Sequence, residues 1–130
     1  MDSGAIRRRL ALGAAVLAAS GALALAVPGS AQAATAGGCG GREVRTLPFS
    51  TGTVHVYKRD GYVCAVTVTH KPGVRRQMSV SVQARGNRPV VDKGQYRLLA
   101  GPVTVHAGQR CVWLKGSVDG RSVSSGWILC

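Results

Sequence analysis

Short runs of β-branched and aromatic residues, separated by glycine-rich turns, fill the chain from residue 42 to its last residue. One run, residues 77–85, alternates strictly between apolar and polar side chains, as does a strand with one buried and one solvated face. No stretch past residue 33 repeats apolar residues at helical spacing. The pattern therefore predicts an all-β domain, a small β-sandwich or barrel of about seven short antiparallel strands.

The predicted strands follow one another at intervals of about 8 to 12 residues. They cover residues 42–49, both arms of a hairpin over 52–69, and then 77–85, 95–100, 103–107, 111–118 and 123–130. Pro48 restricts the first strand to a sheet edge, and Gly101-Pro102 is expected to end the strand over 95–100. Residues 86–94 are predicted to form a loop.

The hairpin over residues 52–69 turns at Asp60-Gly61. A two-residue loop there would place Tyr57 opposite Cys64 and divide the apolar side chains between both faces of the sheet. A three-residue loop, which also takes in the residue before Asp60, instead places Val56 opposite Cys64. It gathers the apolar side chains on one face: Val54, Val56, Cys64, Val66 and Val68. We therefore predict the three-residue loop.

Four cysteines, Cys39, Cys64, Cys111 and Cys130, predict two disulfides in an exported chain. They lack the short spacing typical of zinc ligands, so no metal or other cofactor is expected. In the last hairpin, a four-residue loop over 119–122 would set Cys111 directly opposite Cys130. This register favours the pairs Cys111–Cys130 and, by elimination, Cys39–Cys64, although three connectivities stay open on sequence alone.

Residues 1–33 have the three-part pattern of a secretory signal peptide. Three arginines, Arg7 to Arg9, precede an apolar run over 10–27, and a small-residue triplet ends at Ala33. An uncleaved anchoring helix is the alternative, but the run is mostly Ala and Gly and no charge cluster follows it. We predict cleavage after Ala33, which leaves 97 of the 130 residues: a flexible lead-in over 34–41 and one β domain over 42–130. Such a protein is expected to be secreted and extracellular.

The mature chain is strongly basic. Without Arg7, Arg8, Arg9 and Asp2, its 17 basic residues become 14 and its 5 acidic residues become 4, a formal net charge of +10. Such a surplus favours polyanions: teichoic or teichuronic wall polymers, acidic polysaccharide, anionic lipid headgroups or nucleic acid. The candidate polyanion-binding residues are Arg75, Arg76, Arg85, Arg88 and Lys93. A solvated basic surface without a specific partner is the alternative interpretation.

Acidic residues are too few for most catalytic sites. Of the four that remain, Asp60 and Asp119 belong to Asp-Gly turns whose geometry explains them. The histidines form no metal-ligand or nucleophile motif. A basic ribonuclease would need Glu43 as base and His55 or His106 as acid, brought together only by the fold. The protein is therefore predicted not to be an enzyme.

The aromatic residues give little support for nucleic-acid binding. Trp113 and Trp127 lie in the last hairpin, where the predicted register faces Trp127 with Leu114 and core packing is expected. Only Tyr57 and Tyr62 accompany basic residues, around the first turn. No specific nucleic-acid partner is predicted, and contact with a membrane is expected only through the cleaved signal peptide.

Six short sequence blocks follow one another along the mature chain and carry a resemblance to a known family. They are GCG at 38–40, GTVHVY at 52–57, CAVTVT at 64–69, GQY at 94–96, AGPVTVH at 100–106 and CVWLKGSV at 111–118. Together with the cysteine positions, this set resembles the spore-associated protein A family of streptomycetes, small secreted proteins found with spores and aerial hyphae. The loops over 74–77 and 85–88 are more basic here than the family pattern. The resemblance implies an actinomycete spore or envelope location, and it offers no catalytic residue to carry over.

Charge, cysteines and resemblance together predict a secreted, non-catalytic protein of the spore or cell envelope. Its basic surface would hold anionic wall polymer through salt-sensitive contacts. One alternative is a cationic antimicrobial or inhibitor-like protein, in which a disulfide-bounded loop engages a foreign target. The small basic ribonuclease is the other.

Overall fold

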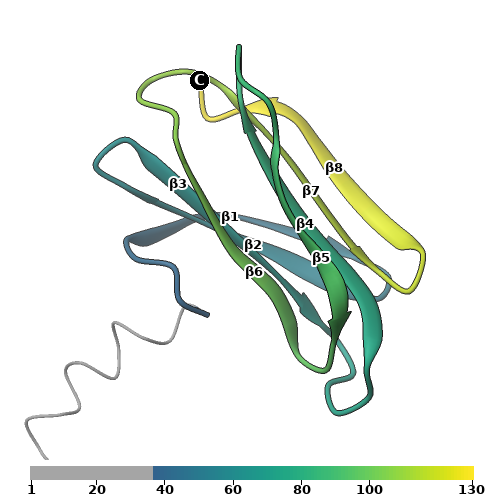
Figure 1. Cartoon of the computed structure of the whole chain (residues 1–130). Coiled ribbons are helices and arrows are strands. Elements are labelled where there is room, and N and C mark those ends of the chain that lie inside the picture. The colour runs from purple at the N-terminus through teal and green to yellow at the C-terminus, as the bar shows by residue number, and fades with distance from the viewer. Residues whose placement is uncertain (1–36) are drawn as a thin grey trace, which may run out of the picture. The chain divides into compact units, whose positions relative to one another are not determined.

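Residues 37–130 form two four-stranded antiparallel sheets that pack face to face (Figure 1). The structure is a computed structural model and describes these residues; the predicted signal peptide and the lead-in up to residue 36 lie outside them. The all-β sandwich prediction is confirmed, with eight strands where about seven were expected. Within residues 37–130 there is no helix long and apolar enough to cross a membrane.

The chain crosses from one sheet to the other three times, after the third, fifth and sixth strands. Sheet A has the order β1-β2-β3-β6, with β1 at Arg42–Phe49, β2 at Gly52–Arg59, β3 at Tyr62–Thr69 and β6 at Leu99–His106. Sheet B has the order β5-β4-β7-β8, with β5 at Val90–Tyr96, β4 at Arg76–Ala84, β7 at Val112–Val118 and β8 at Arg121–Ile128. The expected edge position of Pro48 is observed, because β1 forms one border of sheet A.

The core lies between the sheets and follows from the period of two along each strand. Met78, Val80 and Val82 of β4 point inward, and their polar neighbours in sequence point outward. Val54 and Val56 of β2 meet them from sheet A, and all five side chains are 0% exposed. Burying a valine or methionine side chain contributes roughly 1.5–3 kcal/mol, so this layer is the main source of stability.

The predicted loop of the first hairpin is wrong. Arg59 pairs with Tyr62 and Tyr57 with Cys64, so the loop contains only Asp60 and Gly61. Both loop residues have positive φ, 47° and 83°, as a type I′ turn requires. The apolar side chains of β3 are therefore divided between the two faces of sheet A. The three-residue loop is predicted because it avoids this division, which the structure nevertheless contains.

The outer apolar side chains of β3 are covered by the segment that precedes β1. Cys39 is 2% exposed, is bonded to Cys64, and packs with Val66 in a second buried cluster outside the sandwich core. Gly38 lies so close to β6 that a Cβ atom would stand 2.9 Å from Pro102 Cγ. Because of this cover β3 is buried on both faces, and a continuous apolar run is stable there.

The predicted register of the last hairpin is also wrong. Val118 pairs with Arg121, which leaves the two-residue loop Asp119-Gly120 in place of a four-residue loop. A bulge farther along β8 shifts the pairing by one residue, and Cys111 still reaches Cys130. The observed disulfides, Cys39–Cys64 and Cys111–Cys130, are the pairs that the sequence favours. Two disulfides are typical of a protein that folds in an oxidising, extracellular-type environment.

Strands β5 and β6 differ from the prediction at both ends. The expected loop over 86–94 is largely strand β5, and β6 continues through Gly101-Pro102 where a strand end was expected. Ala65 pairs with Val103 and Thr67 with Ala100, so Gly101 and Pro102 form a bulge on an edge strand. Such positions accept proline, because its missing N–H is not needed in the ladder.

Candidate functional site

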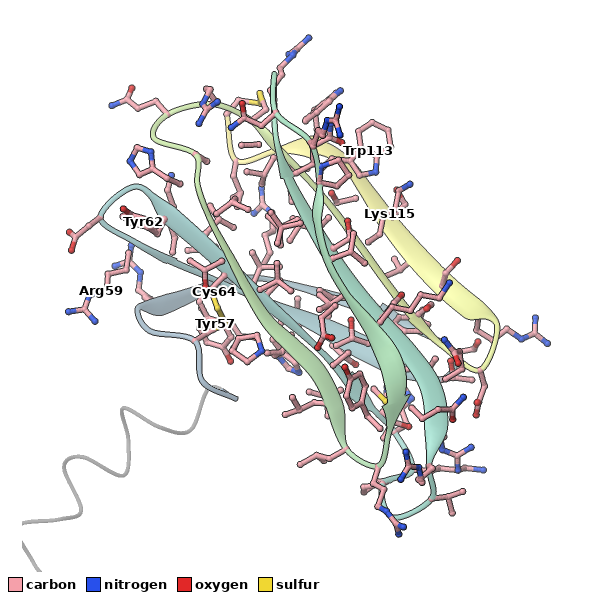
Figure 2. The ribbon with its side chains drawn as sticks, viewed as in Figure 1. Tyr57, Arg59, Tyr62, Cys64, Trp113 and Lys115 are labelled. Atoms are coloured by element: carbon pink, nitrogen blue, oxygen red, sulfur yellow. A yellow bond between two sulfur atoms is a disulfide. The ribbon has the colours of Figure 1, made fainter. Side chains whose placement is uncertain are left out.

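The outer face of sheet B is a surface that no other described strand covers. Because Val112 and Leu114 point into the core, their neighbour Trp113 must point outward. Figure 2 shows Trp113 and Lys115 projecting from this side of the sandwich. The expectation that the tryptophans pack in the core is therefore wrong for Trp113.

A β-bulge turns Trp127 outward as well. Lys115 pairs with Ser124, and without interruption this register would set Gly126 opposite Trp113 and turn Trp127 inward. Instead, Ser125 and Gly126 together face the single residue between Trp113 and Lys115, and Trp127 becomes the partner of Trp113. The Ser125 hydroxyl holds the bulge, accepting the backbone N–H of residue 114 at 2.9 Å and donating to the Gly126 carbonyl at 2.6 Å. Gly126 has a φ of 73°, which a residue with a side chain rarely adopts.

The two indoles form an exposed aromatic pair. Their centroids lie 5.3 Å apart at an interplanar angle of 86°, an edge-to-face arrangement. Trp113 Nε1 donates to Ser124 Oγ at 2.7 Å, whereas Trp127 remains 37% exposed. The Arg85 guanidinium lies 5.4 Å from the Trp127 ring centroid, within the range of a cation–π contact.

Polar and basic side chains surround this pair in rows across the sheet. Trp113 pairs with Gln83, and the next outward row contains Ser81, Lys115 and Ser124 together with the exposed Val91 at the edge strand. A further row contains Lys93, Ser79, Ser117 and Ser122. We refer to this surface as the tryptophan face and define it by Gln83, Arg85, Lys93, Trp113, Lys115 and Trp127.

The five predicted polyanion-binding residues do not form one cluster. Arg75 and Arg76 lie at the start of β4, whereas Arg85 and Arg88 follow its end, about 30 Å away at about 3.3 Å per residue. Lys93 lies between them, on β5 opposite Ser79. Arg85 and Lys93 therefore belong to the tryptophan face, Arg88 lies in the loop between β4 and β5, and the other two arginines belong to the opposite end of the sandwich.

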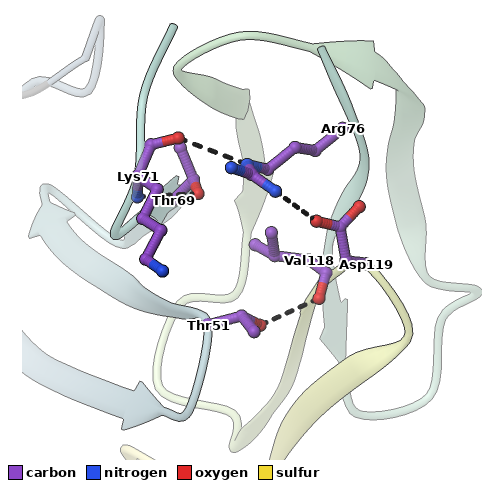
Figure 3. Close-up of polar contacts among 6 residues, drawn as sticks. All are labelled: Thr51, Thr69, Lys71, Arg76, Val118 and Asp119. Atoms are coloured by element: carbon purple, nitrogen blue, oxygen red, sulfur yellow. Dashed lines mark hydrogen bonds and ion pairs between the residues drawn. The ribbon is translucent and has the colours of Figure 1, made fainter. Parts of the chain in front are cut away.

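Arg76 is occupied by an internal contact. Its guanidinium donates to Asp119 Oδ2 at 2.7 Å and to the Lys71 carbonyl at 3.2 Å (Figure 3). Nearby, the Thr51 hydroxyl donates to the Val118 carbonyl at 2.8 Å, which ties the β1–β2 turn to β7. A shallow pocket opens between these groups, but Arg76 and Asp119 largely neutralise each other there. Arg76 therefore adds little to polyanion binding.

The ribonuclease candidates are only partly brought together. His55 Nδ1 lies 2.6 Å from Glu43 Oε2 on the outer face of sheet A. Burial, and secondarily the Glu43 charge, raise the pKa of the neighbouring Tyr57. His106 is not part of this group: it packs edge-on against Tyr62, with ring centroids 4.8 Å apart. The Cys39–Cys64 disulfide also lies on this face. It packs against Tyr57, because Cys64 is the cross-strand neighbour of that tyrosine.

The remaining carboxylate, Asp92, joins the two sheets. It faces inward on β5, where Oδ2 accepts the Gly101 N–H at 2.7 Å and Oδ1 accepts the Tyr96 hydroxyl at 2.6 Å. The hydrogen bond from the Tyr96 hydroxyl to Asp92 is the main cause of a raised Tyr96 pKa, and burial and the Asp92 charge make smaller contributions. Among residues 37–130 there is no group of three or more His, Cys, Asp or Glu side chains that could hold a metal ion.

Comparisons with family models, curated proteins and solved structures returned no match to this chain. The function of this site must therefore be inferred from its chemistry. It combines a partly exposed indole pair with hydroxyl groups, an amide group and cations on the outer face of sheet B.

The sequence contains a signal for the tryptophan face that our interpretation did not use. The segment Ser124-Ser125-Gly126 interrupts an otherwise regular strand pattern, and an isolated glycine in a strand often marks a bulge. A bulge before Trp127 reverses the face on which that side chain lies. No local signal, however, indicates that Arg85 lies beside Trp127, because the two residues meet only through the β4–β7–β8 pairing.

Proposed function

We propose that the protein is a secreted, non-catalytic component of the spore or cell envelope that binds anionic wall polymer through its basic surface. The resemblance to the spore-associated protein A family supports the location. The two disulfides are consistent with export, because such bonds persist in oxidising compartments.

The observation that carries the proposal is the shortage of partners for the positive charges. Of the fourteen Lys and Arg residues outside the predicted signal peptide, only Arg59 and Arg76 lie within 4.0 Å of a carboxylate of the described residues. Most of the basic side chains therefore have no nearby carboxylate, and the resulting positive field attracts polyanions.

The tryptophan face and its border are the best place for such contact. Arg85, Arg88 and Lys93 are exposed there, and Lys115 adds a fourth cation that the sequence interpretation did not single out. Lys93 lies on β5, Arg85 and Arg88 lie in the loop between β4 and β5, and Lys115 lies on β7, so one extended chain that crosses the sheet can meet several of them. Each exposed contact is weak, and affinity comes from their number.

Binding of the purified protein to isolated cell walls tests the proposal. We expect retention at about 0.05 M salt and release at about 1 M salt, where screening acts within about 3 Å. The double reversal Arg88→Glu with Lys93→Glu should weaken retention about tenfold at low salt. Arg42→Glu with Arg45→Glu, on exposed positions of β1, makes the same change in net charge on sheet A and serves as the matched control.

Two results would contradict the proposal. Retention that persists unchanged at 1 M salt would rule out a charge mechanism. Equal losses in the two double variants would show that only net charge matters and that sheet B carries no binding surface.

A second candidate, cleavage of RNA, is favoured by the short Glu43–His55 contact. Incubation of the protein with RNA, before and after His55→Ala and His106→Ala, tests it. The proposal of a non-catalytic protein expects no cleavage by any of the three. Cleavage that His55→Ala abolishes would assign the activity to the Glu43–His55 pair and refute the non-catalytic role.

A further inference from the structure

The exposed indole of Trp127 is the feature of sheet B that charge alone does not explain. The bulge at Ser125 and Gly126 turns this side chain outward, although the uninterrupted register would have turned it toward the core. Bulges that redirect a side chain are common next to functional sites. The outward position is therefore built into β8 by its own hydrogen bonds.

The surroundings of the indole pair suit a sugar ring. A pyranose presents an apolar C–H face that packs on an aromatic ring, and hydroxyl groups around its rim that need hydrogen-bond partners. Within two rows of Trp127 the sheet offers the Gln83 amide and the hydroxyls of Ser81 and Ser124. Arg85 and Lys115 flank the same area and can pair with an acidic group on the sugar.

Two other kinds of partner fit less well. Protein interfaces are depleted in lysine and serine at their centre, whereas the two rows beside the indole pair contain two lysines and five serines: Lys93, Lys115, Ser79, Ser81, Ser117, Ser122 and Ser124. Single-stranded nucleic acid stacks successive bases on parallel aromatic platforms. The indoles of Trp113 and Trp127 are nearly perpendicular, at 86°, and cannot both serve as such platforms.

We propose that the tryptophan face is a binding site for an anionic polysaccharide, with a pyranose ring packed on Trp127 and its acidic groups paired with Arg85 and Lys115. This inference rests on the proposed function, because it specifies which kind of anionic polymer the basic surface binds. It adds a requirement that charge alone does not impose: the polymer must contain sugar rings.

Four polymers separate these requirements in a titration followed by tryptophan fluorescence and calorimetry. Polygalacturonate has acidic pyranose rings, dextran has neutral ones, inorganic polyphosphate has charge without sugar, and an oligothymidylate is a single-stranded nucleic acid. We expect polygalacturonate to bind most tightly and to change the tryptophan emission. Polyphosphate should bind by charge without changing the emission, and dextran should bind weakly.

Trp127→Ala should weaken polygalacturonate binding about tenfold and leave polyphosphate binding unchanged. Lys115→Ala should weaken the binding of both polyanions. Tyr62→Ala is the matched control, since Tyr62 is an aromatic residue that is 50% exposed on sheet A, and it should change neither affinity. Trp127→Phe keeps an aromatic ring, so it should retain most of the affinity and provides the comparison if the alanine variant folds poorly.

The outcomes distinguish the inference from the proposed function. If the wild-type protein binds polygalacturonate and polyphosphate equally, and Trp127→Ala and Trp127→Phe bind both as the wild type does, the sugar site is refuted while the charge-based function stands. Tighter binding of the oligothymidylate than of polygalacturonate would also refute the sugar site. If neither polyanion nor isolated wall binds the wild-type protein, both proposals fail.

Discussion

The outer faces of the two sheets are opposites, although their strands obey the same alternation. In sheet A, β3 carries Cys64 and Val66 on its outer face, and the segment around Cys39 buries them. In sheet B, the outer face of β4 carries Ser79 and Ser81, and no described strand covers it. The apolar outer face of β3 is covered by a segment that a disulfide holds in place, whereas the polar outer face of β4 stays accessible to solvent and to ligands.

This comparison explains where the binding proposals fall. The covered face contributes to stability, and its Glu43–His55 pair lies beside that cover. The tryptophan face contributes less to stability, so its side chains can be selected for contacts outside the molecule. Substitutions on the two faces should therefore differ in their effect on stability.

Removing the cover should cost more than removing the other disulfide. The Cys39–Cys64 and Cys111–Cys130 bridges span 25 and 19 residues, for which loop entropy alone predicts about 3 kcal/mol each. We expect Cys39→Ala with Cys64→Ala to lower the free energy of unfolding by at least about 1 kcal/mol more than Cys111→Ala with Cys130→Ala, because the outer face of β3 is then exposed. Urea unfolding of both double variants measures the difference. Equal losses would mean that the cover contributes nothing beyond loop closure.

Filling the space between the sheets should be costly, whereas a change on the outer face of sheet B should not. A Cβ atom at Gly116 would collide with Val54 Cγ2 and lie 2.5 Å from Thr67 Oγ1. Gly116→Ala should therefore lower the free energy of unfolding by about 2 kcal/mol. Ser81→Ala, on the outer face two strands from the sheet edge β8, is the control and should stay within about 0.5 kcal/mol of wild type. If Gly116→Ala leaves the free energy of unfolding unchanged, the two sheets can move apart at this point without losing stability.

An inward hydroxyl of β3 should be dispensable. Thr67 is 0% exposed, and its Oγ1 has no hydrogen-bond partner among the described residues. Thr67→Val replaces that hydroxyl with a methyl group and should raise the free energy of unfolding by about 1 kcal/mol. Thr104→Val, at an exposed position of β6, should have an effect close to zero. A destabilised Thr67→Val protein would indicate that the hydroxyl has a partner in solution.

The smallest expected effect concerns the edge where the sheets are joined. Because the Asp92 hydrogen bond raises the Tyr96 pKa in the folded protein, folding favours the protonated phenol. This contribution is fully present below the unfolded pKa of about 10 and is lost as pH rises through the higher folded value. Absorbance titration of tyrosinate should show that Tyr96→Phe removes an ionisation step above the ordinary tyrosine pKa of about 10. If Tyr96→Phe removes an early step instead, the Tyr96–Asp92 contact is not maintained in solution.

Alternation was the most reliable guide to the fold. The strand predicted over 77–85 is observed as β4 at Arg76–Ala84, because strict polar and apolar alternation leaves a single way to bury one face. Strand β5 was missed because Val90–Tyr96 reads as polar and contains Asp92 and Gly94. Asp92 faces inward there because it accepts hydrogen bonds from Tyr96 and from Gly101 of the other sheet, and the Gly101 contact belongs to no local pattern.

Both hairpin loops were predicted too long for one shared reason. We assumed that a hairpin collects its apolar side chains on a single face, so the loop was chosen to fit that face. The structure has the two-residue loops Asp60-Gly61 and Asp119-Gly120, both with positive φ at each residue. In the first hairpin a distant cysteine covers the second face, and in the second a bulge changes the face partway along the strand.

The amino-acid sequence by itself determined the strand-rich fold and the large positive charge, since each follows from local side-chain properties or residue counts. It also favoured the observed cysteine pairs, but through a hairpin register that the structure does not have. Tertiary structure alone decided which faces are covered and where the charges gather. Two features show this: Cys39 buries the outer face of β3, and Trp127 turns outward beside Arg85. The physical reason is that a strand can bury either face or both, and only the segments that pack against it select among these.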